Sequence, residues 1–245
     1  MGFQSNMVNR EVCDLIFVDY ATKKPFLNLD YANVTTTELT GESVFAYGGK
    51  GHPKRVQFSG ERGGTLTIET QVQSAKLWQL VTGGDVSKAA KYVVRTELTS
   101  EDGSKVTIPA GDTVLANSIS VYADDDDCGT QIAHTVTGNE ITFTTALTAG
   151  AKVIVYYVKE TSDKVQRINI KSTSFPKTFT VYGDTVMKTE NDEILPCHFV
   201  GYKCAPQATM SLSFSNNGDP GAITITCDLM ADENDNMLDL ILEEE

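Results

Sequence analysis

The 245-residue chain has few histidines and no long hydrophobic run. Its three histidines, His52, His134 and His198, stand in different sequence contexts. No nucleophile elbow, zinc-protease motif or paired-carboxylate pattern accompanies them. We therefore expect a protein that is not an enzyme. No apolar stretch approaches the roughly eighteen residues that a membrane-spanning helix needs, so we expect no membrane span.

Cysteine is also sparse, and the five cysteines are scattered along the chain. An odd, widely spaced set disfavours a disulfide framework and predicts buried or free thiols. Residues 1–7 lack the basic and apolar segments of a cleaved signal peptide. We therefore expect the chain to fold in a cytoplasm.

Basic residues are outnumbered, and the net charge of −13 comes from two acidic segments. Eight of the 33 acidic residues lie within 228–245, which has no base, and four more are Asp124–Asp127; elsewhere 21 acidic residues face 20 basic ones. General nucleic-acid binders usually carry a basic stripe, so this balance argues against one. It still allows a surface along which DNA passes without binding.

The dominant pattern along the chain is an alternation of apolar and polar residues with a period of two, which indicates half-buried strands. It occurs in residues 66–72, 141–144, 210–215 and 223–227. Continuous apolar runs at Leu15–Val18 and Lys152–Val158 predict more central strands, and Gly, Asn and Asp separate the segments. The sequence predicts a mainly β protein.

One segment predicts a helix over about 74–82. Ser74 suits the N-cap, and Gly83 and Gly84 suit the end of the helix. Residues 87–94 fit either a second short helix or the start of a strand. From about 97 to 160 the chain reads as a separate set of strands, which predicts either a small inserted β domain or an extension of one sheet.

The glycine-rich segment at residues 48–64 does not match a phosphate-binding loop. A Walker loop needs glycine where Val44 stands and serine or threonine where Gly51 stands. We expect a long mobile loop, at about 37–64, that contacts a partner. Its candidate contact residues are Lys50, His52, Lys54, Arg55 and Arg62.

Three clusters of metal-binding residue types lack the spacing of a metal site. They are the aspartates at 124–127, the acidic segment 232–236, and Cys197 and His198 with Cys204. We expect no metal and no cofactor.

The order of these segments resembles the tail tube proteins of tailed bacteriophages. The resemblance rests on residues 41–62 followed by the strand at 65–72 and the helix, on residues 174–183, and on the closing strands of 210–229 around Asn217–Pro220. It covers roughly residues 10–92 and 161–230.

The resemblance implies an antiparallel β-sandwich or half-barrel body with a flanking helix, formed by residues 1–96 and 161–245. It further implies stacked homohexameric rings that form a hollow channel, through which genomic DNA leaves without specific binding. The segment at 37–64 is expected to be an extended loop or hairpin that reaches a neighbouring subunit or ring. Residues 97–160 are expected to lie on the outer surface or to face a surrounding sheath. Tail sheath, tape measure and tail terminator proteins are the implied partners, in a virion tail assembled in the host cytoplasm.

Acidic residues are the expected counterparts of the basic loop, or else they line the channel: Asp232, Glu233, Asp235 and Asp239. Two other functions stay open. One is a tail-tip or surface-decorating adhesion module that works through residues 97–160. The other is an unrecognised hydrolase built on β structure.

Overall fold

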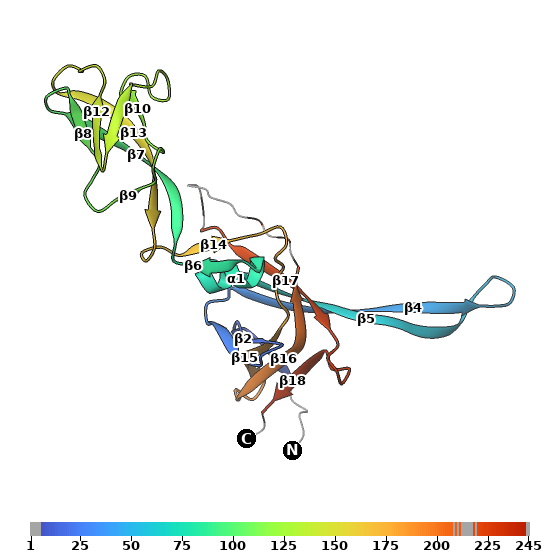
Figure 1. Ribbon diagram of the computed structural model, residues 1–245. Coiled ribbons are helices and arrows are strands. Elements are labelled where there is room, and N and C mark those ends of the chain that lie inside the picture. The colour runs from blue at the N-terminus through green and yellow to red at the C-terminus, as the bar shows by residue number, and fades with distance from the viewer. Residues whose placement is uncertain (1–5, 208, 210, 212–217, 219, 244–245) are drawn as a thin grey trace. The chain divides into compact units, whose positions relative to one another are not determined.

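The computed structural model describes residues 6–207, 209, 211, 218 and 220–243. Its strands are antiparallel, and one helix occurs in the part that is described (Figure 1). The predicted mainly β fold is confirmed. The chain divides into two compact units, unit 1 (Met1–Asp85 with Ile168–Glu245) and unit 2 (Val86–Arg167).

Unit 1 is built on a nine-stranded antiparallel sheet. Its strands are β1 (Met7–Val8), β2 (Asp14–Asp19), β3 (Pro25–Leu29), β4 (Val34–Tyr47), β5 (Lys54–Thr70), β15 (Phe179–Thr189), β16 (Ile194–Pro206), β17 (Ile223–Met230) and β18 (Leu238–Leu242). The main path runs β3-β2-β15-β16-β17-β5-β4, while β1 pairs with β15 and β18 with β16. Most of the strand expected at 210–215 lies outside the described residues.

The helix α1 (Ala75–Thr82) covers one face of this sheet. Ser74 Oγ accepts a hydrogen bond from the backbone N–H of Leu77 at 3.1 Å, and Gly83 ends the helix in the left-handed conformation. The apolar side of α1 joins a core that includes buried residues of β2, β5, β15 and β17. One face of the sheet is therefore the core face, and the opposite one is called the outer face below.

Close packing in this core depends on a glycine. The ring of Phe199 lies against Gly183, so a Cβ atom there would be 1.9 Å from Phe199 Cε1. Cys197, Cys204 and Cys227 are buried nearby, Cys13 is half-buried and Cys128 in unit 2 is exposed. All five cysteines fall among the described residues and are free thiols, as the sequence predicts.

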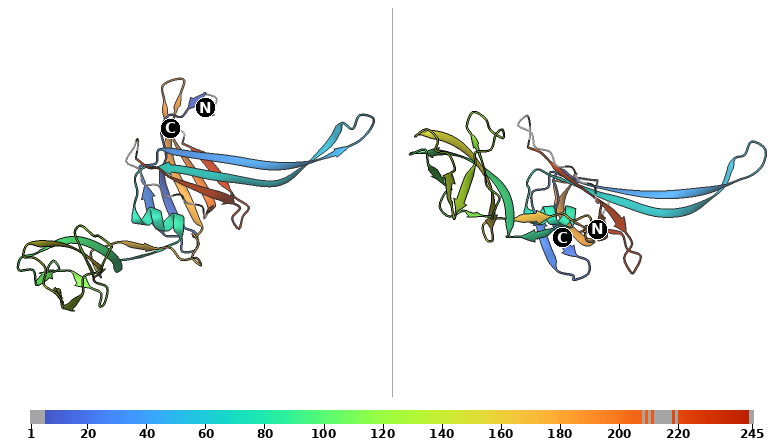
Figure 2. Two further views of the ribbon diagram at one scale, coloured as in Figure 1. Left: turned by 90° about the horizontal axis from the view of Figure 1, so that it is seen from above. Right: turned by 45° about the horizontal axis from the view of Figure 1, so that its top comes forward.

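Strands β4 and β5 continue together beyond the sheet that supports them (Figure 2). β17 pairs with β5 only at Thr65–Thr70, so residues 39–64 form a two-stranded extension, called the arm below. Only residues 48–53 connect the two strands. The expectation of a long mobile loop is therefore wrong, because most of these residues are in the β4–β5 ladder, and the segment at 37–64 is an extended hairpin.

Unit 2 has its own sheets and its own core. Its strands are β7 (Ala90–Ser100), β8 (Lys105–Thr107), β9 (Thr113–Val114), β10 (Ser120–Ala123), β11 (His134–Thr137), β12 (Glu140–Phe143) and β13 (Ala151–Thr161). One sheet has the order β10-β13-β7 with β9 added to β13, and the other has the order β11-β12-β8. β6 (Asp85–Ser87) and β14 (Arg167–Asn169) pair where the chain passes between the units.

The boundaries of unit 2 differ from the expected 97–160. β7 pairs with β13 from Ala90 opposite Thr161 to Ser100 opposite Ala151, so the residues before 97 belong to the same sheet. Residues 87–94, which fitted either helix or strand, lie mainly in β7.

Replacing Gly183 with alanine should destabilise unit 1 by about 1–3 kcal/mol, because the added methyl group forces the Phe199 ring to move. Urea denaturation followed by the fluorescence of Trp78, the single tryptophan, reports on unit 1. Gly41→Ala is the matched control, since its Cβ would meet nothing within 4 Å. Equal stability of the two variants would contradict this account of the core.

Candidate functional site

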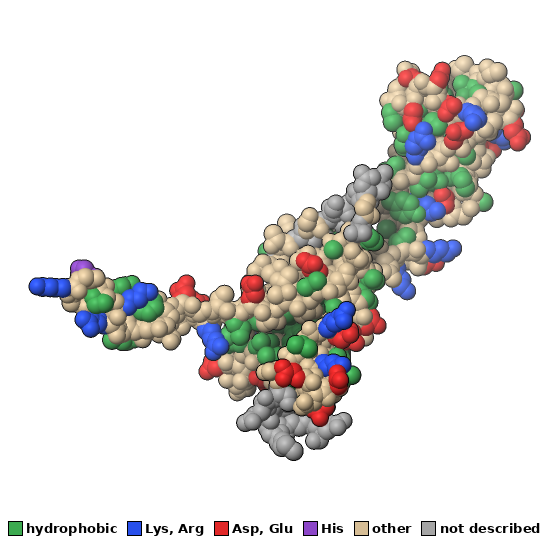
Figure 3. Space-filling model, turned by 180° about the vertical axis from the view of Figure 1, so that it is seen from behind, with side chains coloured by type: hydrophobic (Ala, Val, Ile, Leu, Met, Phe, Trp, Pro, Cys, Tyr) green, Lys and Arg blue, Asp and Glu red, His purple; other side chains and the backbone are tan. Residues whose placement is uncertain are grey.

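Basic residues gather at the end of the arm (Figure 3). Lys50 and His52 lie in the connecting turn, and Lys54 and Arg55 begin β5. Arg55 Nε donates to the carbonyl oxygen of Gly48 at 3.1 Å, and Lys54 Nζ lies 3.8 Å from the centre of the Phe45 ring. Residues 43–60 include no acidic residue, so the end of the arm is positively charged.

The fifth basic residue expected there, Arg62, lies closer to the sheet than the other four. Arg62 is paired with Gly41, where the register of β4 against β5 shifts. The structure thus brings together four of the five predicted contact residues and places Arg62 between the arm's end and the sheet.

One side of the arm is apolar and exposed. Val44 is paired with Phe58 and Ala46 with Val56, so these four side chains share one side of the ribbon. Exposed fractions are 66% for Val44, 60% for Phe58 and 51% for Val56. This surface was missed from the sequence, where only the alternation at Val44 and Ala46 and at Val56 and Phe58 could have indicated it.

The strand β4 is an edge strand along its full length. Among the described strands it pairs only with β5, and it contains neither lysine nor proline. Charged side chains, lysine above all, and proline commonly protect sheet edges from pairing with another chain, and the charged residues of β4 are Glu38 and Glu42. The edge of β4 therefore presents unpaired backbone groups to a partner.

Threonines and acidic residues occupy the outer face of β4, β5 and β17. Three rows of paired residues cross these strands, namely Val34–Glu69–Thr224, Thr36–Thr67–Thr226 and Glu38–Thr65–Asp228. The alternate residues, such as Ile68 and Ile225, are buried in the core. Because these rows have three carboxylates and no base, this part of the face is acidic. Glu38, Glu69 and Asp228 are absent from the acidic candidates named from the sequence.

The predicted acidic candidates lie around the connection from β17 to β18. Asp232 is half-buried and its Oδ1 accepts the backbone N–H groups of Asn234 and Asn236, each at 2.8 Å. Glu233 and Asp235 are exposed in the same turn. Within the described residues, no group of three or more His, Cys, Asp or Glu side chains is arranged to hold a metal ion.

The fourth candidate, Asp239, is exposed in β18. Its Oδ2 accepts a hydrogen bond from the Tyr202 hydroxyl at 2.5 Å. This bond raises the pKa of Tyr202 above its ordinary value. Asp239 is thus held on the outer face, whereas the other three candidates occupy a turn.

His198 connects the end of β18 to the middle of the sheet. Its Nδ1 is 2.6 Å from Asp184 Oδ1 and its Nε2 is 3.2 Å from Glu243 Oε1. Only the protonated ring can donate both hydrogen bonds, because neutral imidazole has a single N–H group. The hydrogen bond that His198 donates to Asp184, with a further contribution from Glu243, raises the pKa of His198.

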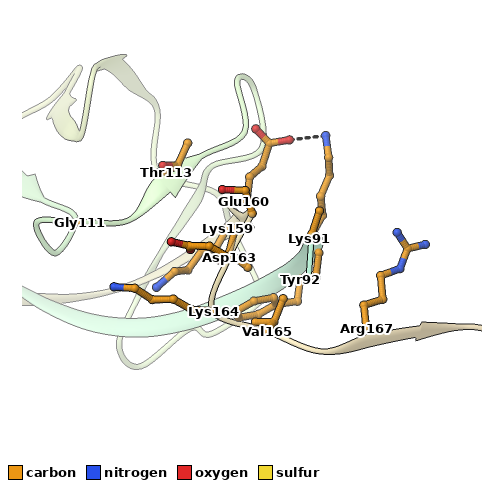
Figure 4. A pocket seen from close by; sticks show the side chains of 14 residues that line it. Lys91, Tyr92, Gly111, Thr113, Lys159, Glu160, Asp163, Lys164, Val165 and Arg167 are labelled. Atoms are coloured by element: carbon orange, nitrogen blue, oxygen red, sulfur yellow. Dashed lines mark ion pairs between the residues drawn. The ribbon is translucent and has the colours of Figure 1, made fainter. Parts of the chain in front are cut away.

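Unit 2 contains an open cleft of about 830 Å³ (Figure 4). Tyr92, Lys159, Lys164 and Arg167 are among the residues that line it. Lys159 forms an ion pair with Asp112, so part of this positive charge is neutralised.

The sheet, with the unpaired edge of β4 and a projecting arm, is suited to association with another chain. The chain matches the YomU/Tube protein family over residues 8–241 and belongs to that family. Comparison with curated proteins finds no match. The resemblance to phage tail tube proteins is thereby confirmed at the level of the family. The one helix in the described part of the chain is too short to cross a membrane.

His198 should make the stability of unit 1 depend on pH. Because its folded-state pKa is raised, its contribution is complete below the ordinary value of 6.5 and is lost as the pH rises through the raised value. We expect the wild-type urea midpoint, followed by Trp78 fluorescence, to fall over this range and that of His198→Gln to change less. His52→Asn, altered at the exposed end of the arm, should keep the wild-type profile. Parallel profiles for His198→Gln and wild type would exclude this role.

Proposed function

We propose that the protein is a subunit of a hollow phage tail tube, in which hexameric rings stack to form the channel for DNA ejection. Membership of the YomU/Tube family indicates a structural protein of the tail tube. The proposal goes further in assigning hexameric rings, their stacking and the passage of DNA.

The arm is the observation that carries this proposal. A two-stranded ribbon without support from a third strand is marginally stable in water. From Leu39 to Tyr47 the arm's part of β4 spans roughly 27 Å, which is long enough to reach another subunit. Pairing of the β4 edge with a neighbour closes a ring and removes the exposed edge. The arm then contacts an adjacent ring, with the acidic region Asp232–Asp239 as its charge-complementary partner.

The acidic, threonine-rich rows of β4, β5 and β17 line the channel in this proposal. Hydroxyl groups suit a water-filled lumen, and carboxylates repel the phosphates of DNA. DNA therefore slides past Glu38, Glu69 and Asp228 without specific binding. In this proposal Glu38, Glu69 and Asp228 line the channel, whereas the acidic candidates of the β17–β18 turn face a neighbouring ring.

The remaining assignments follow from the tube. Unit 2 is an inserted domain on the outer surface, and the protein is not an enzyme. It belongs to the virion tail, is assembled in the host cytoplasm, and has tail sheath, tape measure and tail terminator proteins as possible partners.

Reversal of two charges at the end of the arm tests the stacking contact. Lys54→Glu combined with Arg55→Glu should greatly reduce tube length, because the arm then repels its acidic partner. Negative-stain electron microscopy and light scattering of the purified protein measure this loss. The control combines Lys88→Glu with Lys164→Glu, which changes the net charge equally at exposed positions of unit 2. Normal tubes from the Lys54 and Arg55 variant would refute the assignment.

Adhesion by unit 2 is a second candidate function, favoured by the cleft in Figure 4. An aromatic ring with lysine and arginine nearby suits a negatively charged sugar. The full chain should bind an acidic oligosaccharide in calorimetry, and Tyr92→Ala with Arg167→Ala should weaken binding at least tenfold. A neutral oligosaccharide of equal length is the control. If the chain binds neither the acidic nor the neutral oligosaccharide, this function is excluded.

A further inference from the structure

We propose that the arm of one copy docks on a specific surface of a second copy, the outer face of β2, β15, β16 and β18. This surface is called the acceptor face below. The inference rests on the proposed tube assembly and identifies the surface that receives the arm.

Register defines the acceptor face. Ile16 is paired with Tyr182, and Tyr182 with Val200, on the side opposite the core residues Leu15 and Val181. One strand further, His198 is paired with Ile241. The large apolar side chains exposed on this face are Ile16 (37%), Tyr182 (42%), Val186 (37%), Ile194 (64%) and Ile241 (44%).

The charges of the acceptor face are opposite to those of the arm. Asp14, Asp184 and Asp239 lie among its apolar residues. Lys188, at the end of β15, pairs with Asp192 at 2.7 Å. His198 is bridged by two carboxylates, and Lys203, near the other end of β16, has its Nζ 5.5 Å from the centre of the Tyr20 ring.

The arm matches this combination of apolar and acidic groups. Its apolar side can cover the exposed aliphatic and tyrosine side chains. Lys50, Lys54 and Arg55 at its end meet the aspartates, among them Asp239, which also belongs to the acidic region Asp232–Asp239. Burial of apolar area favours docking, and charge complementarity selects its orientation. Docking also supplies the support that the two-stranded arm lacks within its own chain.

A second copy is the occupant that fits the topology. The arm continues from β4, which is the edge strand furthest from β2 and β15 in the sheet order, and it projects away from the sheet (Figure 2). Arm and acceptor face are different surfaces, so each copy can give one arm and receive another. Such a head-to-tail contact produces rings or open stacks and not a closed pair.

Cross-linking between two cysteine variants of the chain tests the contact directly. Mixtures of Val56→Cys and Ile241→Cys chains, both with Cys128→Ser to remove the exposed native thiol, are assembled and treated with a short bis-maleimide. We expect a heterodimer on denaturing gels. Val56→Cys with Leu240→Cys is the matched control, because Leu240 is adjacent and 71% exposed but lies on the opposite face of β18. Equal or greater cross-linking through Leu240 would overturn the inference.

Assembly thresholds provide a second measurement. Phe58→Ser in the arm and Ile241→Ser on the acceptor face should each raise the concentration at which tubes form by about tenfold or more. Circular dichroism of the unassembled variants verifies that they fold. The double variant should be little worse than either single one, because both remove the same contact.

The outcomes separate this inference from the proposed function. Tubes that form at the wild-type threshold with Ile241→Ser, and that lack the Val56–Ile241 cross-link, would overturn the acceptor face and leave the tube intact. A wild-type chain that forms neither rings nor tubes at any concentration would contradict both. Cross-linked dimers that never extend would support the contact and contradict the tube.

Discussion

Strand β5 is longer than the part of the sheet that supports it, and the functional surfaces of unit 1 follow from this mismatch. Its residues from Thr65 onward lie between β4 and β17, whereas those from Lys54 to Gly64 pair with β4 alone. The supported part anchors the ribbon in the core. In the unsupported part, the two faces of the ribbon, the edge of β4 and the positively charged end are all exposed. A ribbon of this kind gains stability from contact with another chain, so the mismatch favours assembly.

The two faces of the sheet have different roles because only one is covered. α1 and the buried residues around Phe17 and Phe179 pack on the core face, and Gly183 gives the Phe199 ring its space there. The outer face has two chemically distinct regions. Threonines and carboxylates on β4, β5 and β17 suit water and repel phosphate, whereas aliphatic side chains among aspartates on β2, β15, β16 and β18 suit a basic, apolar ribbon. One sheet can thus provide both a channel wall and a docking surface.

Local patterns predicted the elements better than their connections. Ser74 and Gly83 mark the ends of α1, and alternation around Ile68 and Ile225 identifies strands whose partners the sequence does not show. The glycines of the arm indicate a flexible loop, and no local signal shows the ladder, because the paired residues Val44 and Phe58 are fourteen positions apart. Unit 2 begins earlier than the sequence indicates, because Ala90 pairs with Thr161 of β13, a contact without any local signal.

The sequence by itself determined the β class, the capped helix α1, the unpaired thiols and the positive charge of residues 43–60, because each depends on residue type and short-range spacing. Only the tertiary structure decided that Lys50 and Arg55 stand at the end of a ribbon, that Glu38, Glu69 and Asp228 share one face, and that Ile16, Tyr182 and Ile241 share another. The physical reason is register. A shift of one residue between distant strands moves every side chain to the opposite face, and register is set by packing of the whole sheet.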